Sequence, residues 1–246
     1  EATKNNYIMC ITYTPTKIGL AAADVTTGDF YTTEVEDSRR LMDELMKYSP
    51  SEIICNDAFY VSGFDISDLR NRLQMAISTI EPYYFDDEGC EKCIMRHFGT
   101  KSLIGLGLED FPVGTIASGA LLQYLLNTQK NDLVHINHIQ SYLTSKYMLL
   151  DSSTRRNLEL CETLREKQKR GSLLWVLDKT KTAMGARTLR NYIEQPLLNK
   201  ADMEARLDAV EELTKDSVSR DEIREYLNPI YDLERLLSKV TYKTAN

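Results

Sequence analysis

The chain has 246 residues, 42% hydrophobic and 27% charged, a composition typical of globular proteins and a length sufficient for two modest domains. It lacks a signal-peptide pattern and an apolar run long enough to span a bilayer, and its five scattered cysteines are an odd number, so a disulfide scaffold is disfavoured and a cytoplasmic protein is indicated. The net charge of −7 is uneven: residues 1–132 hold 11 Lys and Arg against 20 Asp and Glu, a net −9, whereas residues 133–246 hold 19 against 17, a net +2, so the first half is unsuited to binding a phosphate backbone.

The first half has the pattern of a mixed α/β domain. A helix capped by Asp37 or Ser38 should end before Pro50. Before this helix, three alternating apolar runs are joined by short turns. They predict an antiparallel meander with strands at Tyr7–Thr14, Ile18–Val25 and Phe30–Val35. Beyond the helix we expect a buried strand at Ile53–Cys55, a looser stretch at Asp57–Glu81, and helices at Asp87–Phe98 and Thr115–Asn127.

The second half has a helical pattern throughout. Asp151 or Ser152 should cap a first helix, and Thr182 should cap a second that ends at Pro196. The apolar stripe of the first comprises Leu158, Cys161 and Leu164. Further helices are expected from Asn199, with the stripe Met203, Leu207, Val210 and Leu213, from Ser219, which matches a capping box with Glu222, and along Ile230–Val240.

The predicted fold class is therefore α/β followed by all-α. Lys130–Asp132 marks a plausible boundary, which gives an α/β domain at 1–132 and a helical domain at 133–246. The chain begins without an initiator Met, and its last helical stripe has no stop signal. We therefore expect a piece of a longer protein.

Seven ordered strings stand out in the second half: Leu149–Asp151, Thr154–Leu160, Gly171–Asp178, Thr180–Arg190, Gln195–Leu197, Arg206–Val210 and Tyr231–Leu236. They resemble the start of the helical core in the bacterial MutS family of DNA mismatch repair proteins. Upstream, residues 19–31 resemble a hairpin of that family's connector domain, so the resemblance covers nearly the whole chain. The residues that carry the signature are Asp151, Thr154, Arg155, Arg156, Asn157, Leu158, Trp175, Leu177, Asp178, Gly185, Arg187, Leu189, Pro196, Arg206, Leu207, Asp232, Glu234 and Arg235.

The resemblance implies a ribonuclease-H-like connector domain followed by the N-terminal part of a helical lever and core domain. The family's Phe-x-Glu mismatch wedge, DNA clamp and Walker A loop are absent from this sequence. The resemblance therefore implies a non-catalytic region that transmits signals between a DNA-binding domain and an ATPase. For the parent protein it implies a bacterial cytoplasmic dimer that binds mismatched double-stranded DNA, ATP and Mg²⁺ and recruits MutL, partly through the connector. It assigns no catalytic, cofactor or metal residue to this chain.

Several signature residues also have a direct physical interpretation. The arginines Arg155, Arg156, Arg187, Arg190 and Arg206 share helical segments with the acids Asp151, Glu159, Glu194, Glu204 and Asp208, a pattern that suits ion pairing across a helical bundle. Gly185 weakens its helix, so we expect a close helix crossing there. Trp175, the single Trp of the chain, is expected to anchor a core.

One basic run is the candidate DNA-facing surface. It comprises Arg165, Lys167, Lys169 and Arg170, beside a flexible Gly171. A solvated loop at a helix end is the alternative, and the pattern favours it. We therefore expect no strong DNA binding by this chain.

Metal and nucleotide sites have weaker sequence support. Cys90, Cys93 and His97 share a helix face and could supply three zinc ligands, but a fourth is not evident, and packing is the favoured role. The string Gly99–Ser102 lacks the spacing of a phosphate loop.

A metal-dependent nuclease is the alternative function, on the analogy of the ribonuclease-H-like fold. Two-metal hydrolysis needs converging carboxylates, and the first predicted strand carries none. Asp24 lies on the second strand and Asp29 in a turn, so the sequence disfavours this alternative.

Overall fold

The computed structural model describes residues 2–241 and divides into two compact units. The α/β unit comprises Asn6–Thr144 and the chain from Leu237 onward, and the helical unit comprises the chain up to Asn5 and Ser145–Leu236. Every named strand lies in the α/β unit, whereas the helical unit is built from helices and an isolated bridge, Tyr147 to Leu197, within the described residues. The predicted class, α/β followed by all-α, is confirmed at this level.

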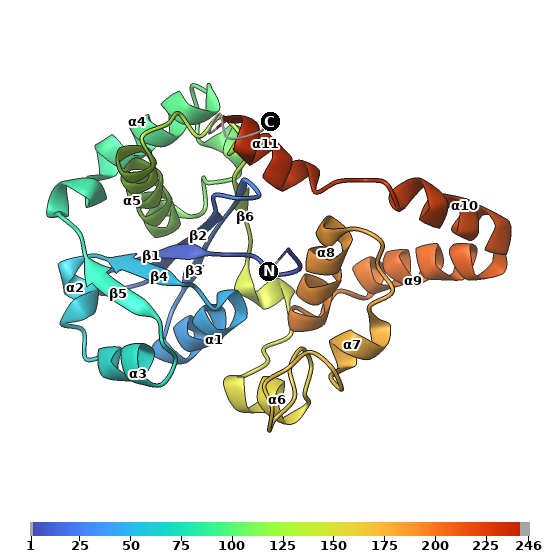
Figure 1. Cartoon of the computed structure of the whole chain (residues 1–246). Coiled ribbons are helices and arrows are strands. Elements are labelled where there is room, and N and C mark those ends of the chain that lie inside the picture. Colours follow the sequence, from blue (N-terminus) through green and yellow to red (C-terminus); the bar gives the residue numbers. More distant parts are fainter. Residues whose placement is uncertain (1, 242–246) are drawn as a thin grey trace. The chain divides into compact units, whose positions relative to one another are not determined.

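The α/β unit contains a mixed sheet and flanking helices (Figure 1). Its strands are β1 (Ile8–Tyr13), β2 (Ile18–Asp24), β3 (Asp29–Val35), β4 (Glu52–Cys55), β5 (Ala76–Thr79) and β6 (Gln140–Ser141). Its helices are α1 (Ser38–Tyr48), α2 (Asp57–Tyr60), α3 (Ile66–Asn71), α4 (Asp87–Phe98) and α5 (Pro112–Gln129), with short 3-10 turns η1 (Pro82–Phe85) and η2 (Ile104–Leu106). A third 3-10 turn, η3 (Thr144–Lys146), begins at the last residue of this unit and continues into the helical unit.

The sheet has the strand order β5-β4-β1-β2-β3-β6. Strands β1, β2 and β3 form the predicted antiparallel meander, β4 and β5 run parallel to β1, and β6 runs parallel to β3. Helices α4 and α5 lie on one face and α1 and α3 on the other (Figure 1). Because both faces are covered, every residue of β2 is buried, which explains the unbroken apolar run of that strand.

Close backbone packing positions α5 on the sheet. A Cβ added at Gly19 in β2 would lie 2.2 Å from the carbonyl oxygen of Val113, at the start of α5. A Cβ added at Gly119, in the middle of α5, would lie 2.4 Å from the Cβ of Cys90 in α4. Glycine is thus required where α5 meets the sheet and where it meets α4.

Most predicted elements of this unit are confirmed. Asp37 caps α1, since its side chain accepts from the Arg40 amide at 2.8 Å, and Ser49 ends the helix in the left-handed region at φ 45°. The expectation of a loose stretch at residues 57–81 is wrong, because α2, α3 and β5 lie within it. These elements are four to six residues long, and β5 buries only Ile77, so no periodic pattern marks them.

The helical unit contains α6 (Ser152–Asn157), α7 (Leu173–Leu177), α8 (Ala183–Glu194), α9 (Lys200–Lys215), α10 (Ser217–Leu227) and the start of α11 (Leu233–Thr241). The predicted caps Asp151, Thr182 and Asn199 are confirmed, because each side chain accepts a hydrogen bond from an amide in the first turn. The expectation of a capping box from Ser219 is wrong. Asp216 caps α10 instead and accepts from both the amide and the hydroxyl of Ser219, at 3.0 and 2.6 Å.

The first helix of this unit is shorter than predicted. It ends at Asn157, and Glu159 adopts a left-handed φ of 47°, so Cys161 and Leu164 lie in a loop. The carbonyls of Glu159 and Leu160 accept from the first amides of α7, at 3.0 and 2.8 Å. These bonds join the residues after α6 to the start of α7, so the two carbonyls do not continue the hydrogen bonding of α6. An apolar stripe in the sequence does not reveal such contacts.

Helices α9 and α10 bury none of their described residues. The predicted stripe of α9 is present in position, but its side chains are partly or largely exposed, from 39% for Met203 to 64% for Leu207. No helix among residues 2–241 combines the length and the apolarity that crossing a membrane requires.

Candidate functional site

The most extensive polar junction of the helical unit is centred on Arg187. Thr182 caps α8 by accepting from the Gly185 amide at 2.9 Å, and this fixes the start of the helix that carries Arg187. The Arg187 side chain is 4% exposed, so its charge requires partners within the protein.

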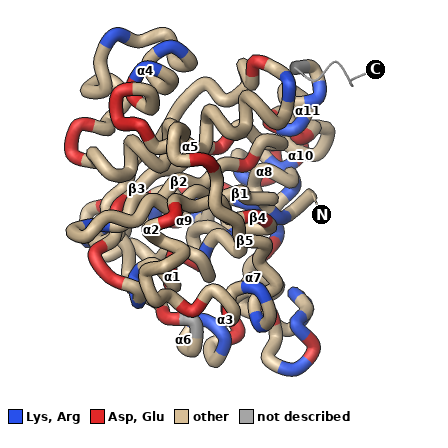
Figure 2. The backbone as a smooth tube through the Cα atoms, turned by 90° about the vertical axis from the view of Figure 1, so that its left-hand side faces the viewer, with Lys and Arg blue, Asp and Glu red and all other residues tan. Residues whose placement is uncertain are grey.

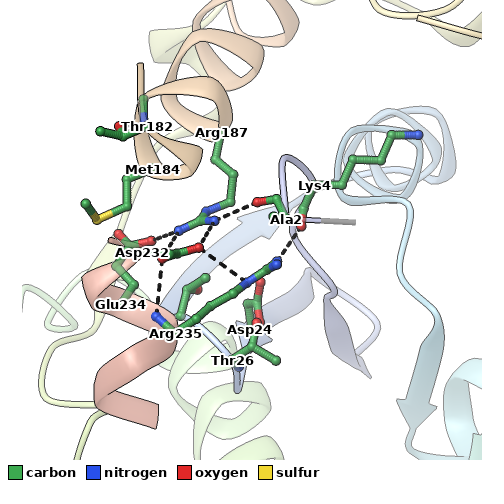
Figure 3. Close-up of polar contacts among 12 residues, drawn as sticks. Ala2, Lys4, Asp24, Thr26, Thr182, Met184, Arg187, Asp232, Glu234 and Arg235 are labelled. Carbon is green, nitrogen blue, oxygen red and sulfur yellow. Dashed lines mark hydrogen bonds and ion pairs between the residues drawn. The ribbon is translucent and has the colours of Figure 1, made fainter. Parts of the chain in front are cut away.

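Asp232 and Glu234, at the start of α11, are those partners. The Arg187 guanidinium donates to both carboxylate oxygens of Asp232, at 2.7 and 2.9 Å, and to one oxygen of Glu234 (Figure 3). It also donates to the carbonyl oxygen of Ala2 at 2.9 Å. A single guanidinium therefore joins α8, to which it belongs, to two other segments: the N-terminal segment and the start of α11. Its planar fork is suited to this because two parallel bonds fix both position and orientation.

Arg235 extends the junction. Its guanidinium donates to the carbonyl oxygen of Lys4 at 2.6 Å, and its Nε lies 3.8 Å from Asp232. Asp232 also accepts from the Arg235 amide at 3.3 Å and so caps the first turn of α11. We call Arg187, Asp232, Glu234 and Arg235 the Arg187 junction.

The charges of the junction support one another. Burial by itself lowers the pKa of Arg187, but the hydrogen bonds with Asp232 and Glu234 outweigh it and raise the pKa. Hydrogen bonding to Arg187 lowers the pKa of Asp232, with burial opposing it. Both groups are therefore charged at neutral pH. The carboxylates and guanidiniums of the junction bind one another, an arrangement that suits a structural clamp.

The arginines of the helical unit were predicted to form ion pairs with acids on the same helical segments, and the structure confirms only some of these pairs. Arg190 pairs with Glu194 at 3.4 Å, as expected for neighbours on one helix. Arg206 instead lies over the ring of Tyr192, 3.6 Å from its centroid. Arg187 reaches acids more than forty positions away, which no helical spacing indicates.

Two further expectations are wrong. Trp175 is 48% exposed and does not anchor a core, because Leu174 is the buried residue of α7. Gly185 does not mark a crossing with a second helix: a Cβ there would meet Thr182 and Thr180, at the start of its own helix.

The candidate basic run lies in the loop between α6 and α7. Arg165, Lys167 and Arg170 are exposed, whereas Lys169 is partly buried and pairs with Asp178. The loop is tied together by its own backbone, with amides of residues 163 and 167 bonded to carbonyls of residues 168 and 163 at 3.0 and 3.2 Å. The run is thus divided into three cations that face solvent and one that holds the loop to the end of α7.

The cysteine pair of α4 has the properties of packed thiols. Cys90 lies 3.1 Å from the carbonyl oxygen of Tyr84, to which it donates, and burial raises its pKa to about 12. Burial likewise raises the pKa of Cys93. His97 is bonded through Nε2 to the carbonyl oxygen of Ile136 at 2.7 Å. Cysteine binds zinc as the thiolate, which this environment disfavours. Within residues 2–241 no three His, Cys, Asp or Glu side chains are placed so that they could hold a metal ion together.

Asp24, the acid on the second strand that the nuclease alternative could use, binds the turn that follows that strand. Asp24 is fully buried and accepts from the amides of Asn6 and Thr26, at 3.0 and 2.9 Å, and from the Thr26 hydroxyl at 2.6 Å. The lone pairs that would bind a metal ion thus hold the end of β2. Nothing in the described geometry favours the nuclease alternative.

Comparison with known proteins places these features in a family. Residues 6–140 match the family model for MutS domain II, and residues 153–246 match that for MutS domain III. A protein of Lachnoclostridium phytofermentans described as DNA mismatch repair protein MutS is 58% identical over 246 residues, which are 100% of this chain and 26% of that protein. Proteins with the same description from Ruminiclostridium cellulolyticum and Clostridium perfringens are 46% and 44% identical, over 99% and 100% of this chain and 28% and 26% of their own length. The chain spans about a quarter of the length of these curated relatives.

Proposed function

Because the chain belongs to the MutS family and carries its domains II and III in that order, we propose that it transmits conformational change within a mismatch repair protein and performs no chemistry itself. In this proposal the α/β unit is the connector and the helical unit is the N-terminal part of the lever and core domain. The chain passes from the first to the second between Thr144 and Ser145, beyond the boundary expected at residues 132 and 133. The strand order, with an antiparallel meander on one side of β1 and two parallel strands on the other, supports a ribonuclease-H-like fold for the connector.

The Arg187 junction is the observation that carries the proposal. A displacement of α8 or of α11 must either move the other or separate a buried ion pair. A displacement of the N-terminal segment must break the hydrogen bonds from Arg187 and Arg235 to the carbonyls of Ala2 and Lys4. Stranding one member of such a pair costs about 3–5 kcal/mol, so concerted movement is favoured. Coupling between distant sites needs an element of this kind, in which packed parts shift together.

The parent protein's ligands belong to the same proposal: mismatched double-stranded DNA, ATP with Mg²⁺, MutL and a second copy, in the bacterial cytoplasm. The string Gly99–Ser102 does not have the position of a phosphate-binding loop. Gly99–Ser102 follows the C-terminal end of α4, whereas phosphates bind at helix N-termini. We therefore assign ATP to other parts of the parent.

An acidic surface on α4 supports MutL docking by the connector. Asp86, Asp87, Glu88 and Glu91 are exposed along this helix, where Figure 2 shows red backbone. Replacing these acids with their amides should weaken MutL recruitment by the full-length parent and leave mismatch binding intact. Undiminished MutL binding would remove this part of the proposal.

The basic loop is proposed as an auxiliary, sequence-independent phosphate contact, on the ground that three of its cations face solvent. Each phosphate contact contributes about 0.9 to the slope of log affinity against log salt for duplex DNA. Replacing Arg165, Lys167 and Arg170 with Ala should reduce that slope by up to about 2.7 in fluorescence anisotropy titrations. The control replaces Lys200 and Lys215, which are exposed on α9 and paired with acids. Equal slopes for the two variants would show that the loop is merely solvated.

The transmission proposal is tested by Asp232→Asn in the full-length parent. The variant should bind mismatched duplex and hydrolyse ATP when each activity is measured alone, because under this proposal Asp232 lies in neither the DNA-binding site nor the ATPase site. The effect of mismatched DNA on ATP hydrolysis should be reduced about tenfold, since the junction that joins three segments is weakened. Glu211→Gln, which alters an exposed pair on α9, is the control. Undiminished coupling in Asp232→Asn would refute the proposal.

A further inference from the structure

A cluster of buried polar side chains lies where the chain is about to leave the α/β unit. Glu44 and Lys47 of α1 form an ion pair at 2.6 Å, with side chains only 10% and 7% exposed. The hydroxyl of Tyr142, just after β6, accepts from Lys47 at 2.9 Å and from the Tyr48 hydroxyl at 2.8 Å, and donates to Glu44. We call these four residues the Tyr142 latch.

Ring contacts reinforce the latch. The Lys47 ammonium lies 4.5 Å from the ring centroid of Tyr48 and 4.3 Å from that of Tyr142. Burial raises the pKa of both phenols well above the usual value, so each remains protonated and able to donate. The buried ion pair of Glu44 and Lys47 and the phenol of Tyr48 thus hold Tyr142, which lies in no helix or long strand.

The backbone ladder around Tyr142 is short, and the Ser141 hydroxyl adds one bond to it by donating to the Gly107 carbonyl at 2.6 Å. Strand β6 is two residues long and pairs only with Tyr31 and Thr32 of β3. The Tyr142 amide donates to the Thr32 carbonyl at 3.1 Å, and the Thr33 hydroxyl donates to the Tyr142 carbonyl at 2.6 Å. So short a ladder is marginal by itself, and the latch supplies the anchor.

The chain passes from one unit to the other between Thr144 and Ser145. Immediately afterwards it is held within the helical unit, because residues 146–148 pair with residues 196–198. The contacts are Met148 amide to Pro196 carbonyl at 2.8 Å, Leu198 amide to Lys146 carbonyl at 3.4 Å, and the bridge between Tyr147 and Leu197. The stretch left between the two anchors is only a few residues long.

We propose that the Tyr142 latch makes residues 140–144 part of the connector and so confines the joint at this crossing to the neighbourhood of Ser145. A short joint whose flanking residues are fixed transmits a movement of one unit to the segment that follows. A long flexible linker would change its own conformation instead and transmit little of the movement. The importance of the joint rests on the proposed function, but its existence does not.

Hydrogen exchange on the whole chain tests the latch. Tyr142→Phe removes one hydroxyl and leaves the Lys47 and Glu44 pair in place, so the fold is retained. Amides of Ser141 and Tyr142 should then exchange about tenfold faster, the factor that corresponds to losing a typical net hydrogen-bond contribution. Tyr226→Phe, at a 75% exposed position on α10, is the matched control and should change nothing.

A distance measurement between the units completes the test. Spin labels at Val61→Cys and Val218→Cys, positions that are 81% and 68% exposed, report one unit each, and the five native thiols are buried. Tyr142→Phe should broaden the distance distribution, and Tyr226→Phe should leave it unchanged. Unaltered exchange or an unaltered distribution in Tyr142→Phe overturns the proposal. Because no DNA, nucleotide or partner is added, failure of the transmission proposal leaves both readouts unaffected.

Discussion

Changing Asp232 to Asn is expected to destabilise the helical unit through its effect on Arg187. The substitution preserves the shape of the side chain and removes its charge, so the buried guanidinium keeps only Glu234 as a charged partner in direct contact. Arg187→Met removes the other member and leaves Asp232 with Arg235 at 3.8 Å. With the double variant these two changes form a thermodynamic cycle.

The magnitude follows from burial. Removing one member of a buried ion pair costs about 3–5 kcal/mol, and Glu234, 38% exposed, compensates only in part, so we expect about 3 kcal/mol for Asp232→Asn. In the double variant neither charge of the pair is stranded. Its cost should therefore fall short of the sum of the single costs by about 2 kcal/mol.

The single Trp of the chain provides the assay. Trp175 lies in the helical unit, so its fluorescence during urea titration reports the unfolding of that unit. The cycle Lys215→Met with Glu211→Gln, on an exposed pair of α9, is the control and should show a coupling below about 0.5 kcal/mol. A coupling that small between Arg187 and Asp232 would refute the view that the junction holds three segments together.

Three further predictions follow from packing and charge. Gly119→Ala should destabilise the α/β unit by about 1–2 kcal/mol in thermal or urea unfolding, because overpacking against Cys90 outweighs the gain in helix propensity. Gly105→Ala is the control and should change the stability little, because the space at its Cβ is open. Equal effects of the two substitutions would contradict the packing argument. Since burial raises the pKa of Cys90 to about 12, alkylation at pH 8 should modify it only after unfolding, and rapid labelling of the native chain would count against a packed thiol. Because hydrogen bonding to Arg187 lowers the pKa of Asp232 below its usual 3.8, the junction should stabilise the helical unit above about pH 4 and lose that contribution as the pH falls through the lowered value. Arg187→Met should weaken this acid dependence, with Arg235 retaining part of it, and an undiminished dependence would exclude the pairing of Arg187 with Asp232 as its source.

Local patterns predicted much of the fold. The meander of β1 to β3 and the helices α1, α4 and α5 are encoded by periodicity and caps within a few residues, so their positions agree closely with the structure. The elements at residues 57–79 are too short to produce a period, and they form because the neighbouring sheet supplies their packing. The early end of α6 depends on hydrogen bonds to α7, a contact that a helical stripe does not encode.

The Arg187 junction could be predicted only in part. Arg187, Asp232, Glu234 and Arg235 stand out through the family resemblance, but their mutual contact does not, since the partners lie on separate helices. The carbonyls of Ala2 and Lys4 carry no side-chain signal at all. Nor does any motif mark Tyr142, because its partners lie almost a hundred positions away on α1.

Hydrogen exchange of the full-length parent protein, with matched and mismatched duplex DNA compared, tests the central claim most directly. If this chain transmits the signal, mismatched DNA should change the protection of the segments that the Arg187 junction joins, α8 and the start of α11, relative to matched DNA. The same shift should be diminished in Asp232→Asn, while Glu211→Gln should retain it. Identical protection of these segments with both duplexes, in a protein that still distinguishes the duplexes by affinity, would contradict the account.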